Sequence, residues 1–341
     1  MLLNRILIAG AAFLLMAASC NKGQTPAPAG PPTNLTLTAT VATDNSGNVT
    51  FRATATNAVS FDFDLGNGVF RTTADGNLVY RYAATGSYDV NVVAKSAGGQ
   101  TASIRKTISV TVARSLVWFD EFDSPGAPDP AKWGYDIGAG GWGNGELQYY
   151  TNRIDNAEVS NGTLKITAKR ESFSGSSFTS ARLLSRNKFS FQYGRVDVRA
   201  KLPVGVGTWP AAWMLGSNFG TVGWPACGEI DIMEHKGSDP NKIYGTVHYP
   251  GNSGGGAIGG TTISTNVSST FHIYSVEWTD QSIKFMIDEV VFFTFANNSN
   301  LPFNQPFFLL LNVAMGGTFG GAVDPLFSSA AMEVDYVRVY N

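Results

Sequence analysis

The chain has 341 residues, enough for about two or three domains, and its 43% hydrophobic and 15% charged residues are typical of globular proteins. A formal net charge of −2 offers no basic surface for nucleic acid, and two cysteines, Cys20 and Cys227, do not make a disulfide framework. Glycine (38 residues) and aromatic residues (12%) are frequent while helical patterns are few, which favours β structure.

Residues 1–20 have the pattern of an export signal. Arg5 precedes the apolar run Ile6–Ala18, whose thirteen residues are too few for a membrane span, which needs about 20. Small residues stand directly before Cys20, and this resembles a bacterial lipobox, although Ala17 replaces the usual leucine. The resemblance predicts lipidation of Cys20 and an exported lipoprotein anchored to a membrane of the cell envelope. A plain secretory signal cleaved nearby is the alternative.

Residues 21–32 are rich in Pro, Gly, Ala and Thr without periodicity, so we expect a flexible linker. From 33 to 113, alternating runs such as Val49–Ala55 recur at intervals of roughly 8–12 residues, which indicates a β-sandwich. Four stretches resemble the immunoglobulin-like polycystic-kidney-disease (PKD) domain: Phe61–Asp64, Gly66–Gly68, Tyr80–Tyr82 and Thr85–Val92. That resemblance implies a spacer, sometimes a binding module, and no catalytic residue is visible in it.

Residues 114–341 form the predicted second domain. Short alternating runs are separated by Gly, Asn and Asp, and no helix of more than three turns is apparent. About 225 residues of strands predict a large two-sheet jelly roll whose concave face can hold an extended ligand. The predicted fold class is therefore all-β, with an N-terminal immunoglobulin-like (PKD-type) β-sandwich followed by a β-jelly-roll domain.

In Gly228–His235, three carboxylates alternate with bulky apolar residues within an apparent strand. Side chains alternate between the two faces of a strand, so Glu229 and Asp231 share a face, and Glu234 joins them only if a β-bulge lies at 232–233. With that bulge, the two glutamate carboxyls come within about 5–6 Å, which matches retaining rather than inverting glycosidases. Asp231 between them would keep one neighbour protonated. A solvated strand edge carrying acids is the alternative.

The motif Glu-Ile-Asp-Ile-Met-Glu at 229–234 resembles the bulged catalytic signature of glycoside hydrolase family 16. This form is typical of the laminarinase-like (endo-β-1,3-glucanase) members and of several agarases and porphyranases. Leu116–Asp123 resembles the opening strand of the family and Met332–Tyr340 its closing strand, so the resemblance covers 115–341. It implies a concanavalin-like jelly roll.

The resemblance also implies roles for the acids: Glu229 as nucleophile, Asp231 as its supporting acid and Glu234 as general acid/base, with no catalytic cofactor. The expected reaction is retaining endohydrolysis of β-1,3-glucan by a monomer, with mixed-linkage β-1,3-1,4-glucan as a further substrate. Two rivals stay open. One is a galactan hydrolase of the agarase or porphyranase type, and the other is a non-catalytic surface glycan-binding protein.

Aromatic rings that stack on sugars are expected beside the acids. Trp209 and Trp213 are i and i+4 in an extended run, so they share a face, and the family places the matching positions near the cleavage point; packing in the core is the alternative. The glycine-rich stretch from Trp142 to Thr151 resembles the laminarinase loop whose asparagine contacts substrate. The resemblance makes Asn144 and Trp142 candidate substrate ligands. For the neighbouring Glu146 and Gln148, fixing the loop is the alternative to binding substrate.

Two further cleft residues come from the resemblance. Arg182 matches a strand whose arginine reaches the cleft, with an ion pair on the sheet as the alternative. His248 is one of three histidines and lies on the strand expected beside the acids, where it can hydrogen-bond a carboxyl or a sugar hydroxyl. His235 points away from the acids by parity, and His272 belongs to a structural strand. No nucleophile motif surrounds Cys227, which is expected to be a small apolar residue.

A structural calcium ion is the last expectation. Many family members bind one on the convex side through a carboxylate of the first strand, a backbone carbonyl and an acid of the last strand. Glu121, Gly162 and Asp335 match those positions, and oxygen ligands of this type suit calcium.

Overall fold

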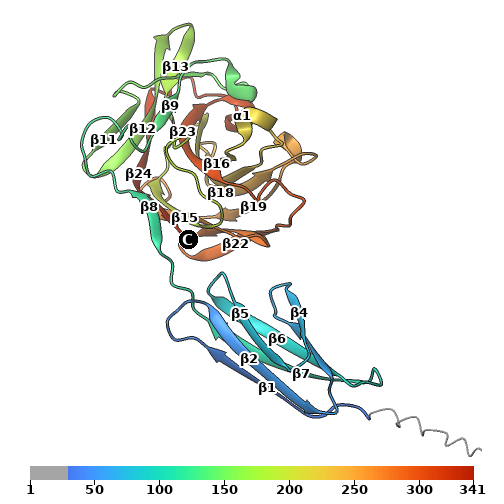
Figure 1. The fold of residues 1–341 in the computed structure, drawn as a ribbon. Helices are drawn as coiled ribbons and strands as arrows, with labels where there is room; N and C mark the ends of the chain where they lie inside the picture. Colours follow the sequence, from blue (N-terminus) through green and yellow to red (C-terminus); the bar gives the residue numbers. More distant parts are fainter. Residues whose placement is uncertain (1–29) are drawn as a thin grey trace, which may run out of the picture. The chain divides into compact units, whose positions relative to one another are not determined.

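The computed structural model describes residues 30–341, so the predicted signal peptide with Cys20 and most of the linker 21–32 lie outside the described residues. The chain divides between Val112 and Ala113 into two compact units, one residue before the boundary expected from the sequence (Figure 1). In the described part of the chain, every helix is too short or too polar to cross a membrane.

The N-terminal unit is made of two antiparallel sheets. The three-stranded sheet has the order β1 (Thr33–Val41), β2 (Asn48–Thr56), β5 (Asn77–Arg81), and the four-stranded sheet has the order β4 (Phe70–Thr73), β3 (Ser60–Asp64), β6 (Gly86–Lys95), β7 (Thr101–Val110). Apolar residues alternate with polar ones along β2, so that Phe51 is buried while Arg52 is exposed. Phe51 meets Phe63 of the other sheet in the core, with ring centroids 6.1 Å apart. The unit is therefore a β-sandwich.

The second unit contains two larger sheets. The ten-stranded sheet consists of β10 (Gln148–Tyr150), β13 (Ser176–Ser180), β12 (Thr163–Phe173), β24 (Ser329–Tyr340), β15 (Gly194–Lys201), β20 (His272–Trp278), β21 (Ser282–Ile287) and β22 (Val290–Ala296), with β11 (Ala157–Ser160) beside β12 and β8 (Leu116–Asp120) beside β24. The seven-stranded sheet has the order β19 (Ile258–Ile263), β18 (Asp239–His248), β17 (Glu229–Lys236), β16 (Thr208–Gly216), β23 (Phe307–Met315), β14 (Arg182–Leu184), β9 (Gly134–Asp136).

Helices in the described residues are single turns in loops: α1 (Phe219–Val222), α2 (Gly317–Gly320), and the 3₁₀ turns η1 (Gly141–Gly143) and η2 (Gly254–Gly256). One large apolar core lies between the two sheets and takes residues from both, for example Ile230 of β17 and Val198 of β15. The all-β, two-sheet architecture expected for this unit is confirmed (Figure 1).

Strand β23 is buried along its whole length, as its uninterrupted apolar sequence predicts. One face, with Leu309 and Leu311, belongs to the main core. The other face, with Phe308 and Leu310, forms a smaller cluster with Leu215 and Cys227 on the opposite side of the sheet. The thiol of Cys227 is buried there and has no disulfide partner within residues 30–341. Leu215 is paired with Glu229 across β16 and β17, so this second cluster lies on the face of the sheet that carries the candidate site.

Candidate active site

Strand β17 contains a β-bulge between its acids. Its register with β16 pairs Trp213 with Asp231 and Ala212 with Met233, so one residue of β17 has no partner. The register with β18 skips at the same place, between Asp231 and Glu234. The bulge predicted at 232–233 is confirmed, and it brings Glu234 to the face that carries Glu229 and Asp231.

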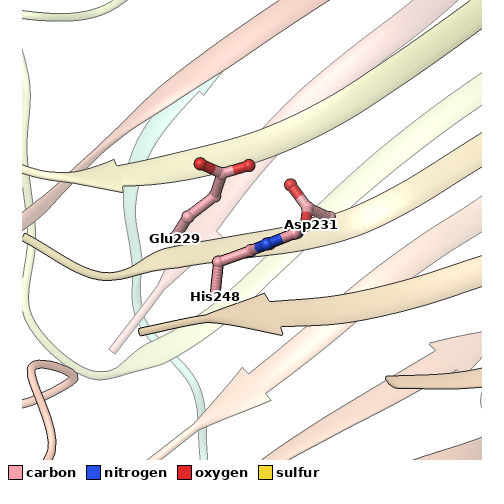
Figure 2. Close-up of side chains that lie close together, drawn as sticks. All are labelled: Glu229, Asp231 and His248. Carbon is pink, nitrogen blue, oxygen red and sulfur yellow. Dashed lines mark ion pairs between the residues drawn. The ribbon is translucent and has the colours of Figure 1, made fainter. Parts of the chain in front are cut away.

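Neighbouring strands complete this face, because directly opposed residues of antiparallel strands share a face. On β18, His248 lies opposite Glu229, Thr246 opposite Asp231, and Tyr244 opposite Glu234. Figure 2 shows the side chains of Glu229, Asp231 and His248 converging from the two adjacent strands. The acids therefore lie in the middle of the seven-stranded sheet, on the face away from the main core.

Two of the three carboxyls are buried, that of Glu229 is partly exposed, and none has a lysine or arginine beside it in the described residues. Asp231 is 3% and Glu234 8% exposed. Among the described residues, His248 is the only basic side chain within ion-pair distance of the three. Burial, and then the charge of its neighbours, raises the pKa of Glu229 to about 8 and that of Glu234 to about 7, and holds the pKa of Asp231 well above its usual value. The group therefore retains protons at neutral pH.

Neutral donors orient the two glutamates. The indole Nε1 of Trp209 donates to Oε1 of Glu234 at 3.0 Å, and the hydroxyl of Thr246 donates to its Oε2 at 3.3 Å. The indole Nε1 of Trp224 donates to Oε2 of Glu229 at 2.7 Å. These hydrogen bonds fix the carboxyl positions and lower the pKa values, but by less than burial raises them.

The tautomer of His248 follows from its two neighbours. The backbone N–H of Gly254 donates to Nδ1 at 3.1 Å, so we assign the ring proton to Nε2, which lies 3.1 Å from Oδ2 of Asp231. Ligand atoms of Glu229, Asp231 and His248 lie within 4.8 Å of one another, as in metal sites. A metal ion would need the Nε2 lone pair that this tautomer lacks, so the arrangement fits a histidine facing Asp231 rather than a metal ligand.

Arg182 lies on β14, two strands from β16, and faces the same side as the acids. Its guanidinium is 4.7 Å from the Trp213 ring and 5.1 Å from the Trp142 ring, so it stacks between two of the candidate sugar platforms. Its Nε is also 3.0 Å from Oδ2 of Asp136 on β9. The ion pair left open by the sequence is therefore present together with the stacking.

The loop around Asn144 is tied down by one buried carboxylate. Glu146 accepts hydrogen bonds from Nδ2 of Asn144 (3.1 Å), Nε2 of Gln148 (2.7 Å) and the hydroxyl of Tyr150 (3.1 Å). Oε1 of Gln148 in turn accepts the backbone N–H of Met315 at the end of β23. Glu146 and Gln148 thus fix the loop against the sheet, and the substrate-binding role of Asn144 and Trp142 stays a prediction.

The residues expected to hold calcium are engaged by arginines. Arg338 donates to both carboxylate oxygens of Glu121, at 2.8 and 2.9 Å, and Arg199 pairs with Asp335. Gly162 lies in the turn between β11 and β12. Both carboxylate oxygens of Glu121 and one of Asp335 are thus held by guanidinium groups, and this arrangement does not favour a cation there.

Several residues of the site were not singled out from the sequence. Trp224 precedes Glu229 by five residues in a turn, outside any periodic pattern. Phe319 of α2 packs on Trp209 at 5.1 Å and on Tyr244 at 5.0 Å between ring centroids, and this extends the aromatic wall beyond Glu234. Phe319 lies in the glycine-rich stretch 316–321, and only the fold brings its side chain beside Trp209, the hydrogen-bond partner of Glu234.

Comparison with known proteins identifies the family. The profile described as glycosyl hydrolases family 16 matches residues 144–338. A β-glucanase from Rhodothermus marinus is 48% identical over 245 residues, a match that covers 66% of this chain and 84% of the relative.

Solved structures agree. A laminarinase from Rhodothermus marinus superposes with a TM-score of 0.65 at 48% identity, covering 67% of this chain and 98% of that structure. LamA from Zobellia galactanivorans, crystallised with laminaritriose and laminaritetraose, gives a TM-score of 0.62 at 45% identity, covering 67% and 99%. In both cases the match covers almost the whole length of the solved relative.

Proposed function

The chain belongs to family 16 of the glycosyl hydrolases, and from this we propose that it is a retaining endo-glycosidase that hydrolyses laminarin-type β-1,3-glucan, with mixed-linkage β-1,3-1,4-glucan as a further substrate. One observation carries the proposal: three carboxyls, two of them buried and that of Glu229 partly exposed, share the bulged face of β17 without a lysine or arginine partner in the described chain. The names of the relatives, β-glucanase and laminarinase, support the choice of substrate.

The proposed mechanism uses the three acids in different protonation states. Glu234 gives its proton to the glycosidic oxygen while the Glu229 carboxylate attacks the anomeric carbon, so the glycosidic bond breaks as a glycosyl–enzyme ester forms. Glu234, now ionised, then takes a proton from water, and the resulting hydroxide releases the sugar from Glu229. The raised pKa of Glu234 suits this double duty at neutral pH.

Asp231 supports both steps. Burial, and the neighbouring Glu234, raise its pKa well above the usual range, so at neutral pH it keeps a proton that it can share with Glu229. Because the pKa of Glu229 is about 8 and that of Glu234 about 7, the form with Glu229 ionised and Glu234 protonated is the minor one at neutral pH. A protonated Asp231 beside Glu229 favours that reactive form, whereas a second full charge would oppose it.

We assign the surrounding side chains to substrate binding. The rings of Trp209, Trp213 and Trp142 offer faces for stacking on sugars, and Asn144, Arg182 and His248 offer polar groups for hydroxyls. Trp209 also donates a hydrogen bond to Glu234, which supports its assignment as a sugar platform at the proposed point of cleavage.

Reducing-end release by the protein lacking residues 1–20 tests the proposal on laminarin, mixed-linkage glucan and agarose in parallel. We expect rapid conversion of laminarin to short oligomers. Activity on agarose with none on laminarin would keep the mechanism and replace the substrate by a galactan. Binding of laminarin without turnover would favour a surface glycan-binding protein.

We further propose that the protein is exported as a monomeric lipoprotein anchored through Cys20 and that its N-terminal sandwich is a PKD-type spacer. The pattern of residues 1–20 and the two-sheet architecture of the first unit support these assignments. Expression with Cys20→Ala tests the anchor: the variant should leave the membrane fraction for the soluble one. A variant that stays with the membrane would contradict lipidation.

A structural calcium ion at Glu121, Gly162 and Asp335 is kept as a prediction, and binding it would require Glu121 and Asp335 to release Arg338 and Arg199. Calorimetry with added calcium and with a chelator tests it. A melting temperature that rises with calcium and falls with the chelator would support the site, and an unchanged one would count against it.

A further inference from the structure

Trp224 combines an exposed ring with a hydrogen bond to the proposed nucleophile. Its side chain is 47% exposed, which is high for a tryptophan, yet its Nε1 donates to Oε2 of Glu229 at 2.7 Å. Its ring centroid is 5.9 Å from that of His248, so the ring lies beside His248 as well as Glu229. An exposed indole with its one donor directed at an acid points to a role in the reaction rather than in the core.

The backbone around Trp224 is well fixed. Gly223 donates to the carbonyl of Phe219 at 2.9 Å and closes α1, and Cys227 donates to the carbonyl of Gly223, also at 2.9 Å. Gly228 then donates to the carbonyl of Pro225 at 3.1 Å, directly before β17 begins. The indole is therefore carried on a closed turn joined to the strand of the nucleophile, and its position relative to Glu229 is set by local hydrogen bonds.

We propose that Trp224 is a positioning residue for Glu229: its indole N–H holds Oε2 of the carboxylate and leaves Oε1 to attack the anomeric carbon. The inference rests on the proposed function, because it assumes that Glu229 is the nucleophile. A hydrogen bond to one oxygen favours the ionised carboxylate and restricts its rotation, and both effects favour attack.

The titratable groups facing Glu229 are Asp231 and Glu234 from its own strand, His248 from β18 and Cys227 from the preceding turn. Strand β16 brings Leu215 opposite Glu229 and contains no titratable residue. Burial and Asp231 raise the pKa of Glu229, whereas His248 and the Trp224 N–H lower it. Removing the N–H should therefore make Glu229 harder to ionise.

The test isolates attack by Glu229 from proton donation by Glu234. A 2-deoxy-2-fluoro laminaribioside with a dinitrophenolate leaving group forms the bond from Glu229 to the anomeric carbon and expels dinitrophenolate, which needs no proton. We expect Trp224→Phe, which keeps an aromatic ring, to move the acidic limb of the inactivation rate upward by about one pH unit. Well below the midpoint this shift alone corresponds to a rate about tenfold lower, and any lower rate that persists at high pH measures the lost restriction of rotation.

Trp213→Phe is the matched control, because its indole Nε1 donates to Asn312 and not to an acid. The control should change the concentration dependence of inactivation and leave the acidic limb in place. If Trp224→Phe has the acidic limb of the wild type while mass spectrometry finds the label on Glu229, the inference fails and the proposed function stands.

A wild-type protein that the reagent does not label would contradict the proposed function instead. The hydrogen bond can be tested separately by ¹⁵N NMR of the indole in the wild-type protein. This test does not need the Trp224→Phe variant and therefore still applies if that variant does not fold. We expect the Nε1–H resonance of Trp224 to titrate with the acidic limb and to lose that titration in Glu229→Gln. A resonance that is insensitive to pH would overturn the inference.

Discussion

On the ten-stranded sheet, Arg195 is 3% exposed and pairs with Asp197 on its own strand and with Glu289 between β21 and β22. The hydrogen bond from Arg195 lowers the pKa of Glu289. On β17 of the other sheet, Glu229 and Glu234 receive only indole and hydroxyl donors, and their pKa values are raised. Glutamate is thus kept ionised beside Arg195, where it supports packing, and partly protonated on β17, where a proton has to move.

Among the changes that test this comparison, Glu229→Gln should have the largest effect, a loss of laminarin hydrolysis. The amide keeps the shape of the side chain but cannot form the glycosyl–enzyme ester, so hydrolysis of laminarin should fall by at least about a thousandfold. Binding of laminari-oligosaccharides, measured by calorimetry, should persist. Retained turnover would remove Glu229 from the role of nucleophile.

Glu234→Gln should lower turnover by roughly 10²–10⁴-fold on laminarin, because the leaving oxygen is no longer protonated. A substrate with a dinitrophenolate leaving group needs no such proton, and added azide can replace the activated water in the second step. With that substrate, azide should restore turnover and give a β-glycosyl azide. If neither the dinitrophenolate leaving group nor added azide raised the turnover of the variant, Glu234 would not be the acid/base.

Arg195→Met tests the paired side of the comparison. Asp197 and Glu289 would lose their guanidinium partner, and Asp197 is 9% exposed, so unfolding free energy should fall by about 3 kcal/mol. Denaturant unfolding measures the loss, while the pH profile of the folded enzyme should not move. A shifted profile would mean that this pair, too, influences the reacting acids.

The smallest effect concerns stability against pH. Burial raises the pKa of Glu234 to about 7 from the ordinary 4.5, so above pH 4.5 the unfolded chain releases a proton that the folded protein keeps. Stability should therefore fall as pH rises from about 4.5 through about 7. Glu234→Gln should melt a few degrees higher than the wild type at pH 8 and close to it at pH 4. Equal differences at both pH values would contradict the raised pKa.

Strand periodicity made part of the site predictable from sequence. Alternation placed Glu229 and Asp231 on one face, and the position of Glu234 required a bulge that the register with β16 and β18 confirms. The uninterrupted apolar run of β23 predicted a buried strand, and the all-β character of the second unit followed from turn spacing.

Contacts between distant loops were not predictable in this way. Phe319 reaches Trp209 only because the fold brings the end of β23 beside the start of β16. The position of Trp224 depends on hydrogen bonds within a short turn, which no periodicity encodes. The arginine pairs of Glu121 and Asp335 depend on cross-strand neighbours, so the sequence showed the carboxylates but not their partners.

Proton NMR of the first product released from laminarin tests the central claim most directly. Retention through a Glu229 ester predicts that the new reducing end appears as the β anomer and converts to the α anomer only later, by mutarotation. Initial appearance of the α anomer would mean inversion by a single displacement. It would contradict the assignment of Glu229 as nucleophile and of Glu234 as both acid and base.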